Sequence, residues 1–243
     1  MSRGTVTIIV NHLTRMKQGY FCVAGVDVTT HEHVRPVPRK GSLSTKLLSR
    51  NGGPFDMAMM VRLDNVKSIA RRPEVEDHLF NPTSARALDA VEPGGFWELL
   101  KKLAKPGLSE LFGPDLVPRG TRACVVDVGK GQASLGCLIP ESPPILFLRH
   151  QYGKDRIRMR VTDGQFDLNL SVTDIRLYKD DHATPNKEIV RRTDRQLASR
   201  NEAIISVGLT RPFAPSSESD VEPVHWLQVN NIHLREDPAW RLG

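Results

Sequence analysis

"HWLQVNNIHL" (His225–Leu234) combines the apolar spacing of a β-strand with a Trp, a Gln, two Asn and two His. Side chains of a strand alternate between its two faces. The apolar residues here fall on odd positions before the Asn pair and on even positions after it. A β-bulge at Asn230–Asn231 adds one residue and returns all of them to one face. The predicted core-facing residues are Leu227, Val229, Ile232 and Leu234.

The opposite face of this strand carries hydrogen-bonding and aromatic side chains. Trp226, Gln228, one of the two Asn, and His233 share it once the bulge is included. A Trp ring stacks on any nucleobase, and Gln or Asn amides bond to base edges. The pattern therefore favours a surface that binds nucleic acid. The alternative is a solvated strand face whose Trp is covered by a neighbouring helix.

A second stretch, "DRIRMRVTD" (Asp155–Asp163), also alternates along its length. One face is apolar and the other carries Arg156, Arg158 and Arg160. Three arginines on one strand face repel one another unless acids or an external anion offset their charge. Pairing with acids of the following strand, such as Asp167, is one explanation. The other, which we favour, is an arginine row that follows a phosphate backbone.

Two Arg-Pro dipeptides end apolar runs, in "HVRPV" (His33–Val37) and "LTRPF" (Leu209–Phe213). Because the residue before a proline is held extended, Arg35 and Arg211 are predicted at strand exits, where loops meet a ligand. Two ordinary turns with solvated arginines are the alternative. Phe213, at the end of the second motif, is a further candidate for base stacking.

Composition and charge limit the class of protein. The chain has 243 residues, of which 39% are hydrophobic and 26% charged, as in folded globular proteins. The formal net charge of +6 favours an anionic partner. No apolar run approaches the roughly 18 residues of a membrane-spanning helix, so no membrane association is expected. Three widely spaced cysteines form neither a disulfide framework nor zinc-binding pairs, which favours a reducing cytoplasmic location.

The order of the predicted elements indicates a mostly-β chain of the α+β class, with about ten short strands and a few helices. Helical patterns occur in an insertion at about 83–112 and again at about 186–200. Residues 121–140 read as a hairpin, and "DIRLY" (174–178) as a further strand. The Pro-rich segment at 142–144 is the best candidate for a boundary between domains 1–143 and 144–243. Short strands at this spacing favour barrels or sandwiches.

Catalytic chemistry has weaker signals in this sequence. Cys22 lies between apolar neighbours, as a core cysteine would. Asp174 could act as a general base, pair with an arginine or form a turn, and His225 is an acid–base candidate. The imidazoles of His31 and His33 share a strand face but lack a nearby third ligand, so no metal and no other cofactor is expected.

Five motifs together resemble the dual OB-containing domain family of prokaryotic proteins. In chain order they are "FCVAG" (21–25), "VRPV" (34–37), "LSVTDI" (170–175), "LTRPF" (209–213) and "HWLQVNNIHL" (225–234). The family usually has an aromatic residue before the first Arg-Pro, where this chain has His33-Val34. The resemblance implies two OB-type barrels. It also implies a nucleic-acid role in bacterial defence, mobile-element or DNA-modification systems, without assigning catalytic residues.

These observations predict two small OB-like barrels that bind single-stranded or locally opened DNA or RNA. The expected binding residues are Arg35, Arg156, Arg158, Arg160, Arg211, Phe213, Trp226, Gln228, Asn230 and Asn231. One alternative is an enzyme that modifies a base, with Cys22, Asp174 or His225 in its pocket. Another is an adaptor subunit that docks on other proteins of a defence or modification system.

Overall fold

The computed structural model describes residues 4–16, 19–151, 153–199, 202–214 and 222–240. The first half is a sheet in the order β1-β2-β3-β6-β5-β7, and pairing of β1 with β5 closes five of these strands into a barrel. Its strands are β1 (Gly4–Arg15), β2 (Tyr20–Asp27), β3 (His33–Pro38), β4 (Leu43–Ser44), β5 (Met59–Ser68), β6 (Asp77–Phe80) and β7 (Arg86–Ala90).

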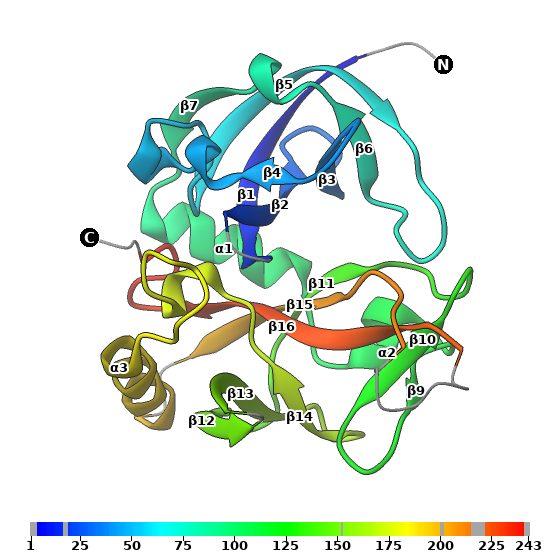
Figure 1. The fold of residues 1–243 in the computed structure, drawn as a ribbon, viewed down its shortest axis with the longest axis vertical. Helices are drawn as coiled ribbons and strands as arrows, with labels where there is room; N and C mark the ends of the chain where they lie inside the picture. The colour runs from blue at the N-terminus through cyan, green and yellow to red at the C-terminus, as the bar shows by residue number, and fades with distance from the viewer. Residues whose placement is uncertain (1–3, 17–18, 152, 200–201, 215–221, 241–243) are drawn as a thin grey trace.

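The second half is more open. One sheet has the order β8-β11-β15-β16-β10-β9, and a second has the order β12-β13-β14. Figure 1 shows the first barrel above β15 and β16, with β12–β14 below them. The strands are β8 (Ala104–Lys105), β9 (Val117–Pro118), β10 (Cys124–Asp127), β11 (Leu135–Leu138), β12 (Ile145–Gln151), β13 (Lys154–Thr162), β14 (Asp167–Ser171), β15 (Ala203–Leu209) and β16 (Val224–Leu234).

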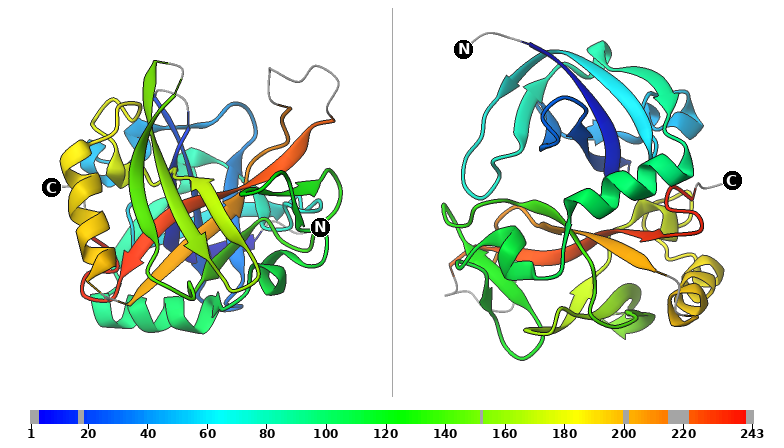
Figure 2. Two further views of the ribbon diagram at one scale, coloured as in Figure 1. Left: turned by 90° about the horizontal axis from the view of Figure 1, so that it is seen from below. Right: turned by 180° about the vertical axis from the view of Figure 1, so that it is seen from behind.

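Helices are few, as predicted for this mostly-β fold. They are α1 (Pro93–Leu103), α2 (Leu108–Phe112) and α3 (Lys187–Ala198). Helix α3 confirms the helix predicted near 186–200, and the Asn186 side chain caps it by accepting a hydrogen bond from the Ile189 N–H. Helix α1 lies along the junction of the two halves (Figure 2, right). In the described part of the chain, no helix is both long and apolar enough to cross a membrane.

Three predicted elements differ in the structure. The helix expected from Thr83 is a short 3₁₀ turn followed by β7, because residues 86–90 pair with β5 at the sheet edge. The hairpin expected at 121–140 does not form, since β10 pairs with β16 and β11 pairs with β15. Residues 175–177 form a 3₁₀ turn capped by Asp174 rather than a strand. In each case, long-range pairing or a local cap overrides the pattern of the sequence.

The predicted bulge in β16 is confirmed. Ser206 of β15 pairs with Asn231, but the next residue, Val207, pairs with Val229, so Asn230 is the extra residue. The four apolar side chains selected by the alternation are all at most 5% exposed: Leu227, Val229, Ile232 and Leu234. The phase slip in the sequence therefore located both the bulge and the core face.

The polar face of β16 lies against the first barrel rather than solvent. Asn231 is fully buried; its Oδ1 accepts from the Leu13 N–H at 2.7 Å, and its Nδ2 donates to the Leu13 carbonyl at 3.1 Å. Asn230 is 4% exposed and His233 is fully buried. The expectation that these side chains share an outward face was wrong, because β1 packs across them. Asn230 and Asn231 thus bond to β1 and join the two halves of the molecule.

Candidate nucleic-acid interface

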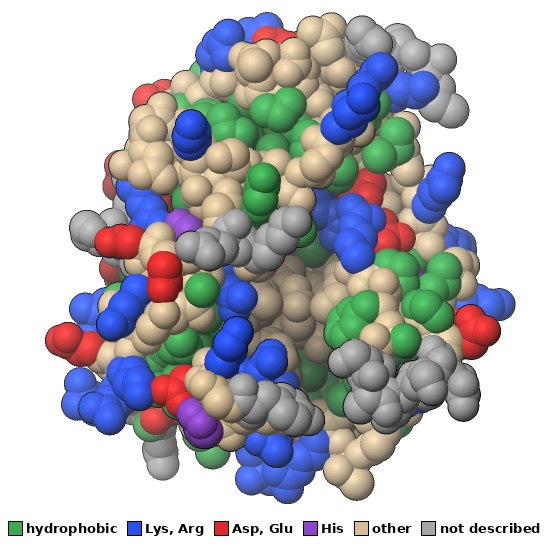
Figure 3. Space-filling model, viewed as in Figure 1, with side chains coloured by type: hydrophobic (Ala, Val, Ile, Leu, Met, Phe, Trp, Pro, Cys, Tyr) green, Lys and Arg blue, Asp and Glu red, His purple; other side chains and the backbone are tan. Residues whose placement is uncertain are grey.

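A cleft of about 790 Å³ lies between the two halves. It is visible as a hollow in the middle of the face in Figure 3, with Lys and Arg side chains gathered around it. Strands β1, β2 and β3 form one wall, and residues of β15, β16 and the segment after β15 form the other. Five of the ten predicted binding residues line this cleft: Arg35, Arg211, Phe213, Gln228 and Asn230. Arg35 and Arg211 contribute positive charge, and Phe213 contributes an exposed ring. Gln228 and Asn230 contribute side-chain amides.

Two arginines of the cleft share one carboxylate. Arg35 Nε donates to Asp77 Oδ1 at 2.5 Å, and Arg211 Nη2 donates to Asp77 Oδ2 at 2.6 Å. Arg211 also pairs with Glu74 at 3.0 Å. These acids raise the pKa of Arg211 against the opposing effect of its burial, which is the largest single influence. Arg35 was expected at an open rim but is only 5% exposed, so it forms part of the cleft wall.

Unsatisfied guanidinium nitrogens mark the same cleft. Within the described residues, Arg35 Nη2 and Arg15 Nε are buried and have no hydrogen-bond partner, and both residues line the cleft. A buried donor without an acceptor costs free energy. These two nitrogens are not reached from the open cleft, but the side chains that carry them line it, so an anion there would lie beside two guanidinium groups. Arg15 was missed by the sequence analysis; its only signal is its place at the end of the first apolar run. Its guanidinium lies 4.6 Å from the centre of the Tyr178 ring.

An aromatic pair stands beside the arginines. Phe213 is 48% exposed. The centre of its ring lies 6.0 Å from the centre of the Trp226 ring. Trp226 is half-buried, and its indole N–H donates to the Phe213 carbonyl at 3.2 Å. The structure thus makes Trp226 the support of Phe213, and leaves Phe213 as the more accessible stacking surface. Gln228 Nε2 donates to Asn230 Oδ1 at 3.0 Å, which fixes the amides of the cleft wall.

The predicted arginine row on β13 is divided in its contacts. Arg160 forms an ion pair with Asp167 at 2.9 Å. For this arginine, the explanation by pairing with an acid of the next strand holds. Arg158 donates to Asn169 and Ser171 of β14, and burial together with the charges of Arg149 and Arg156 lowers its pKa. Arg156 is exposed and lies opposite Arg149 of β12, and no acid pairs with either arginine in the described part of the chain. The positive charge of β13 is therefore concentrated at its Arg156 end.

The three catalytic candidates are not brought together. Cys22 lines the cleft, but burial raises the pKa of its thiol, which disfavours the reactive thiolate. Asp174 is fully buried and forms an ion pair with Arg176 at 2.7 Å, so it has the structural role of an arginine partner. His225 is 1% exposed, and its Nδ1 lies 2.8 Å from the Thr210 carbonyl.

Comparison with known proteins gives a family and two distant structural likenesses. The sequence model of the dual OB-containing domain matches residues 6–232. No curated protein matches the chain. A crystal structure of the tetrameric p202 HIN2 is 10% identical, with a TM-score of 0.33, over 96% of this chain and 92% of that one. A replication protein A heterotrimer bound to ssDNA is 9% identical, with a TM-score of 0.35, over 95% of this chain and 49% of that one.

Proposed function

The chain belongs to the dual OB-containing domain family, and we propose that it binds single-stranded or locally opened nucleic acid in the cleft between its two halves. The observation that carries the proposal is the gathering of Arg15, Arg35 and Arg211 along one cleft that also carries the exposed Phe213 side chain. A phosphate oxygen is an acceptor that matches a guanidinium in charge and geometry. A base of the same nucleotide would then reach the exposed ring of Phe213.

The dimensions of the cleft suit this ligand. Pockets that enclose small ligands are about 300–1,000 Å³ in volume, and this cleft of about 790 Å³ falls within that range. The cleft receives one or two nucleotides of a strand rather than a duplex. Asp77 and Glu74 hold Arg211 in place, so little side-chain entropy is lost when an anion binds.

The remainder of the strand would follow the outer face of β13. Arg15 in the cleft lies over Tyr178, and the charges of both Arg15 and Arg156 act on the pKa of that tyrosine. Tyr178 therefore lies near both arginines. A phosphate backbone that leaves the cleft past Arg15 would next meet Arg156 and Arg149. The proposal includes the bacterial defence, mobile-element or DNA-modification setting that the family implies.

Binding of labelled single-stranded DNA and RNA, measured by fluorescence anisotropy in rising salt, tests the proposal. Phe213→Ala should weaken binding by the value of one base stack, about 1–3 kcal/mol. Val128→Ala, which truncates another exposed apolar side chain outside the cleft, is the matched control and should leave affinity unchanged. If neither nucleic acid binds at low salt, or if both variants bind like the original chain, the proposal fails.

A further inference from the structure

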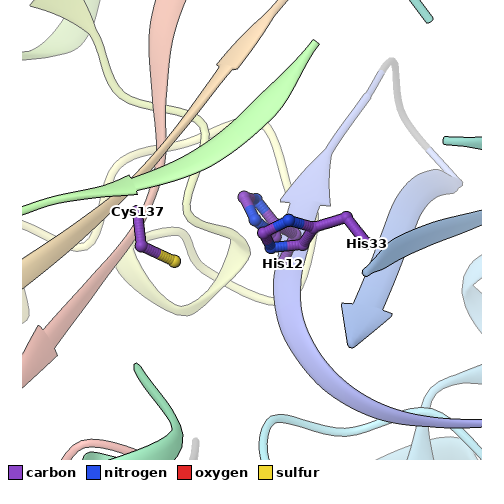
Figure 4. A group of neighbouring side chains, drawn as sticks. All are labelled: His12, His33 and Cys137. Carbon is purple, nitrogen blue, oxygen red and sulfur yellow. The ribbon is translucent and has the colours of Figure 1, made fainter. Parts of the chain in front are cut away.

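A cluster of two imidazoles and one thiol lies at the junction of the two halves, where one of the imidazoles, that of His12, also lines the cleft. His12 of β1, His33 of β3 and Cys137 of β11 each offer one ligand atom, and these atoms lie within 4.8 Å of one another. The ring centres of His12 and His33 lie 5.1 Å apart, with the rings edge to face, and Figure 4 shows the Cys137 thiol directed toward them. The expected pair of His31 and His33 does not form, because His31 is exposed in the turn before β3.

Two acceptor atoms of this cluster share one amide group. Asn11 Nδ2 lies 3.0 Å from His33 Nε2 and 3.6 Å from Cys137 Sγ, so a single amide NH₂ group stands between the two acceptors. In the described residues, His12 Nε2 and Asn11 Oδ1 are buried and have no hydrogen-bond partner. Asn11 is the extra residue of a β-bulge between Val10 and His12, a feature that redirects side chains. A metal ion at this point would take up the lone pairs that the amide now shares.

The protonation of these groups suits a metal ion. Burial is the main cause that keeps the pKa of His12 well below its usual value, and burial lowers that of His33 to about 4. Both rings are therefore neutral near pH 7, and each has a lone pair to give. Burial raises the pKa of Cys137 to about 11, so its thiol keeps its proton until a cation displaces it.

We propose that His12, His33 and Cys137 bind one zinc-class divalent metal ion, with the side-chain oxygen of Asn11 as the fourth ligand. Imidazole and thiolate are the ligands that Zn²⁺ prefers in closed tetrahedral sites. Such a site needs ligand atoms about 3.4–3.6 Å apart, so the widest pair here closes by roughly 1 Å. On binding, the Cys137 thiol releases one proton to solvent, the metal–sulfur bond forms, and no electron is transferred.

Small rearrangements of side-chain amides complete the site. Turning the Asn11 amide by half a turn replaces its NH₂ with the unpartnered Oδ1. His12 Nδ1 lies 3.1 Å from the Asn230 amide. If the Asn230 and Gln228 amides also turn, His12 Nδ1–H donates to Asn230 and the lone pair is left on Nε2. Such a bond to the far ring nitrogen is how metal-binding histidines are oriented in proteins.

A route from solvent leads to the cluster. His33 lines a second hollow of about 480 Å³, whose wall also carries Asp27 and Glu32. These carboxylates make the entrance attractive to a cation. The ion would link β1 and β3 of the first barrel to β11 of the second half, and would hold the wall of the cleft in place through His12. The metal site does not depend on whether the cleft binds nucleic acid.

Cobalt is a direct probe of the proposal, because Co²⁺ bound to a thiolate has a sulfur-to-metal charge-transfer absorption in the near ultraviolet. The full chain, stripped with a chelator, should develop this band at one Co²⁺ per chain, and excess Zn²⁺ should abolish it. Zn²⁺ alone should raise the melting temperature. Cys137→Ser should lose the band, whereas Cys124→Ser, which removes another buried thiol, should keep it.

A second variant protects the test against misfolding. His33→Gln retains every thiol and, with its folding checked by circular dichroism, should bind Co²⁺ at least tenfold more weakly with a displaced band. Absence of the band in the original chain overturns the proposal. Persistence of the same band in Cys137→Ser also overturns it, because the metal would then be held by Cys22 or Cys124.

Discussion

Strands β13 and β16 both alternate apolar and polar residues, yet their polar faces have opposite environments. On β13, Arg156 and Arg160 are exposed and Arg158 is half-buried. On β16, Asn231 and His233 are fully buried. Strand β1 lies across the polar face of β16, and its backbone bonds to Asn231. Alternation assigns residues to a face, but the neighbouring strand decides whether that face meets water.

The chemistry of the side chains agrees with this difference. A neutral amide is buried at little net cost when its donor and acceptor are both bonded, as they are in Asn231. A guanidinium loses far more hydration and needs an anion when it is buried. Asn and His on β16 are therefore suited to an internal junction, and Arg on β13 to solvent or a phosphate. The type of polar residue, rather than its spacing, distinguishes the buried polar face of β16 from the exposed polar face of β13.

The largest expected effect concerns the ion pair that secures the end of β16. Arg176 is 2% exposed; it pairs with Asp174 at 2.7 Å and donates to the Ile232 carbonyl at 2.8 Å. Arg176→Met leaves the Asp174 carboxylate buried and unpaired, so we expect a loss of about 3–5 kcal/mol in the free energy of unfolding. Urea denaturation followed by circular dichroism measures it.

Arg235→Met is the matched control, because Arg235 forms an exposed pair with Glu202 beyond the end of β16. Removing that pair should leave the denaturation midpoint where it was. Equal losses in the two variants would mean that the junction does not depend on the buried pair.

A smaller effect is expected from acid. Burial lowers the pKa of His233 to about 4 in the folded chain, against about 6.5 when unfolded. The unfolded chain binds more protons between these values, so stability is complete above pH 6.5 and falls as the pH drops toward 4. The loss amounts to about 3 kcal/mol from this residue. Denaturation midpoints between pH 7 and 4 should fall steeply. His233→Gln should make this slope less steep, while His12 and His33, whose pKa values are also lowered by burial, retain the rest of it.

His31→Asn, which changes an exposed histidine, should keep the full slope. If the denaturation midpoint of His233→Gln depends on pH as strongly as that of the original chain, protonation of His233 is not a cause of the loss of stability in acid.

A third change tests the hydrogen bonds between the Asn231 amide of β16 and the Leu13 backbone of β1. Asn231→Ala leaves the Leu13 N–H and carbonyl buried without partners, and we expect a loss of about 2 kcal/mol. Asn169→Ala removes an amide from β14 that bonds to Arg158 near solvent, and it should cost far less. A comparison of their urea midpoints measures the difference between an internal and an external amide. Similar midpoints would remove the distinction drawn between β16 and β13.

Local features of the fold could be predicted from the sequence, whereas its long-range pairing could not. The bulge in β16 and helix α3 follow from periodicity and a capping Asn, which act over a few residues. The pairing of β10 with β16 depends on contacts between residues about 100 positions apart, which no local pattern records. A division of the chain near residue 143 stays a prediction, although β10 and β11 share a sheet with β15 and β16.

The cleft illustrates the same limit. Arg35 and Arg211 stand out in the sequence because each precedes a proline, but Arg35 lies inside β3 rather than at its exit. Their common bond to Asp77 joins β3, the start of β6 and the segment after β15. Arg15 has no motif of its own and enters the site because β1 ends there. Its backbone N–H donates to the Thr173 carbonyl of the second half at 2.8 Å. A site at the junction of two parts of a chain can be identified only when the three-dimensional positions of both parts are known.

The smallest expected effect is a difference between Arg156 and Arg160 of β13 in the salt dependence of nucleic-acid binding. Arg156 has no acidic partner among the described residues, whereas the charge of Arg160 is offset by Asp167 at 2.9 Å. If single-stranded DNA follows β13, Arg156→Ala should reduce the slope of log affinity against log salt by about 0.7, the value of one phosphate contact. Arg160→Ala should change the slope less, because Arg160 must leave Asp167 before it meets a phosphate. Equal reductions would show that the ion pair opens on binding and that the whole row acts as one surface; no reduction in either would confine the strand to the cleft.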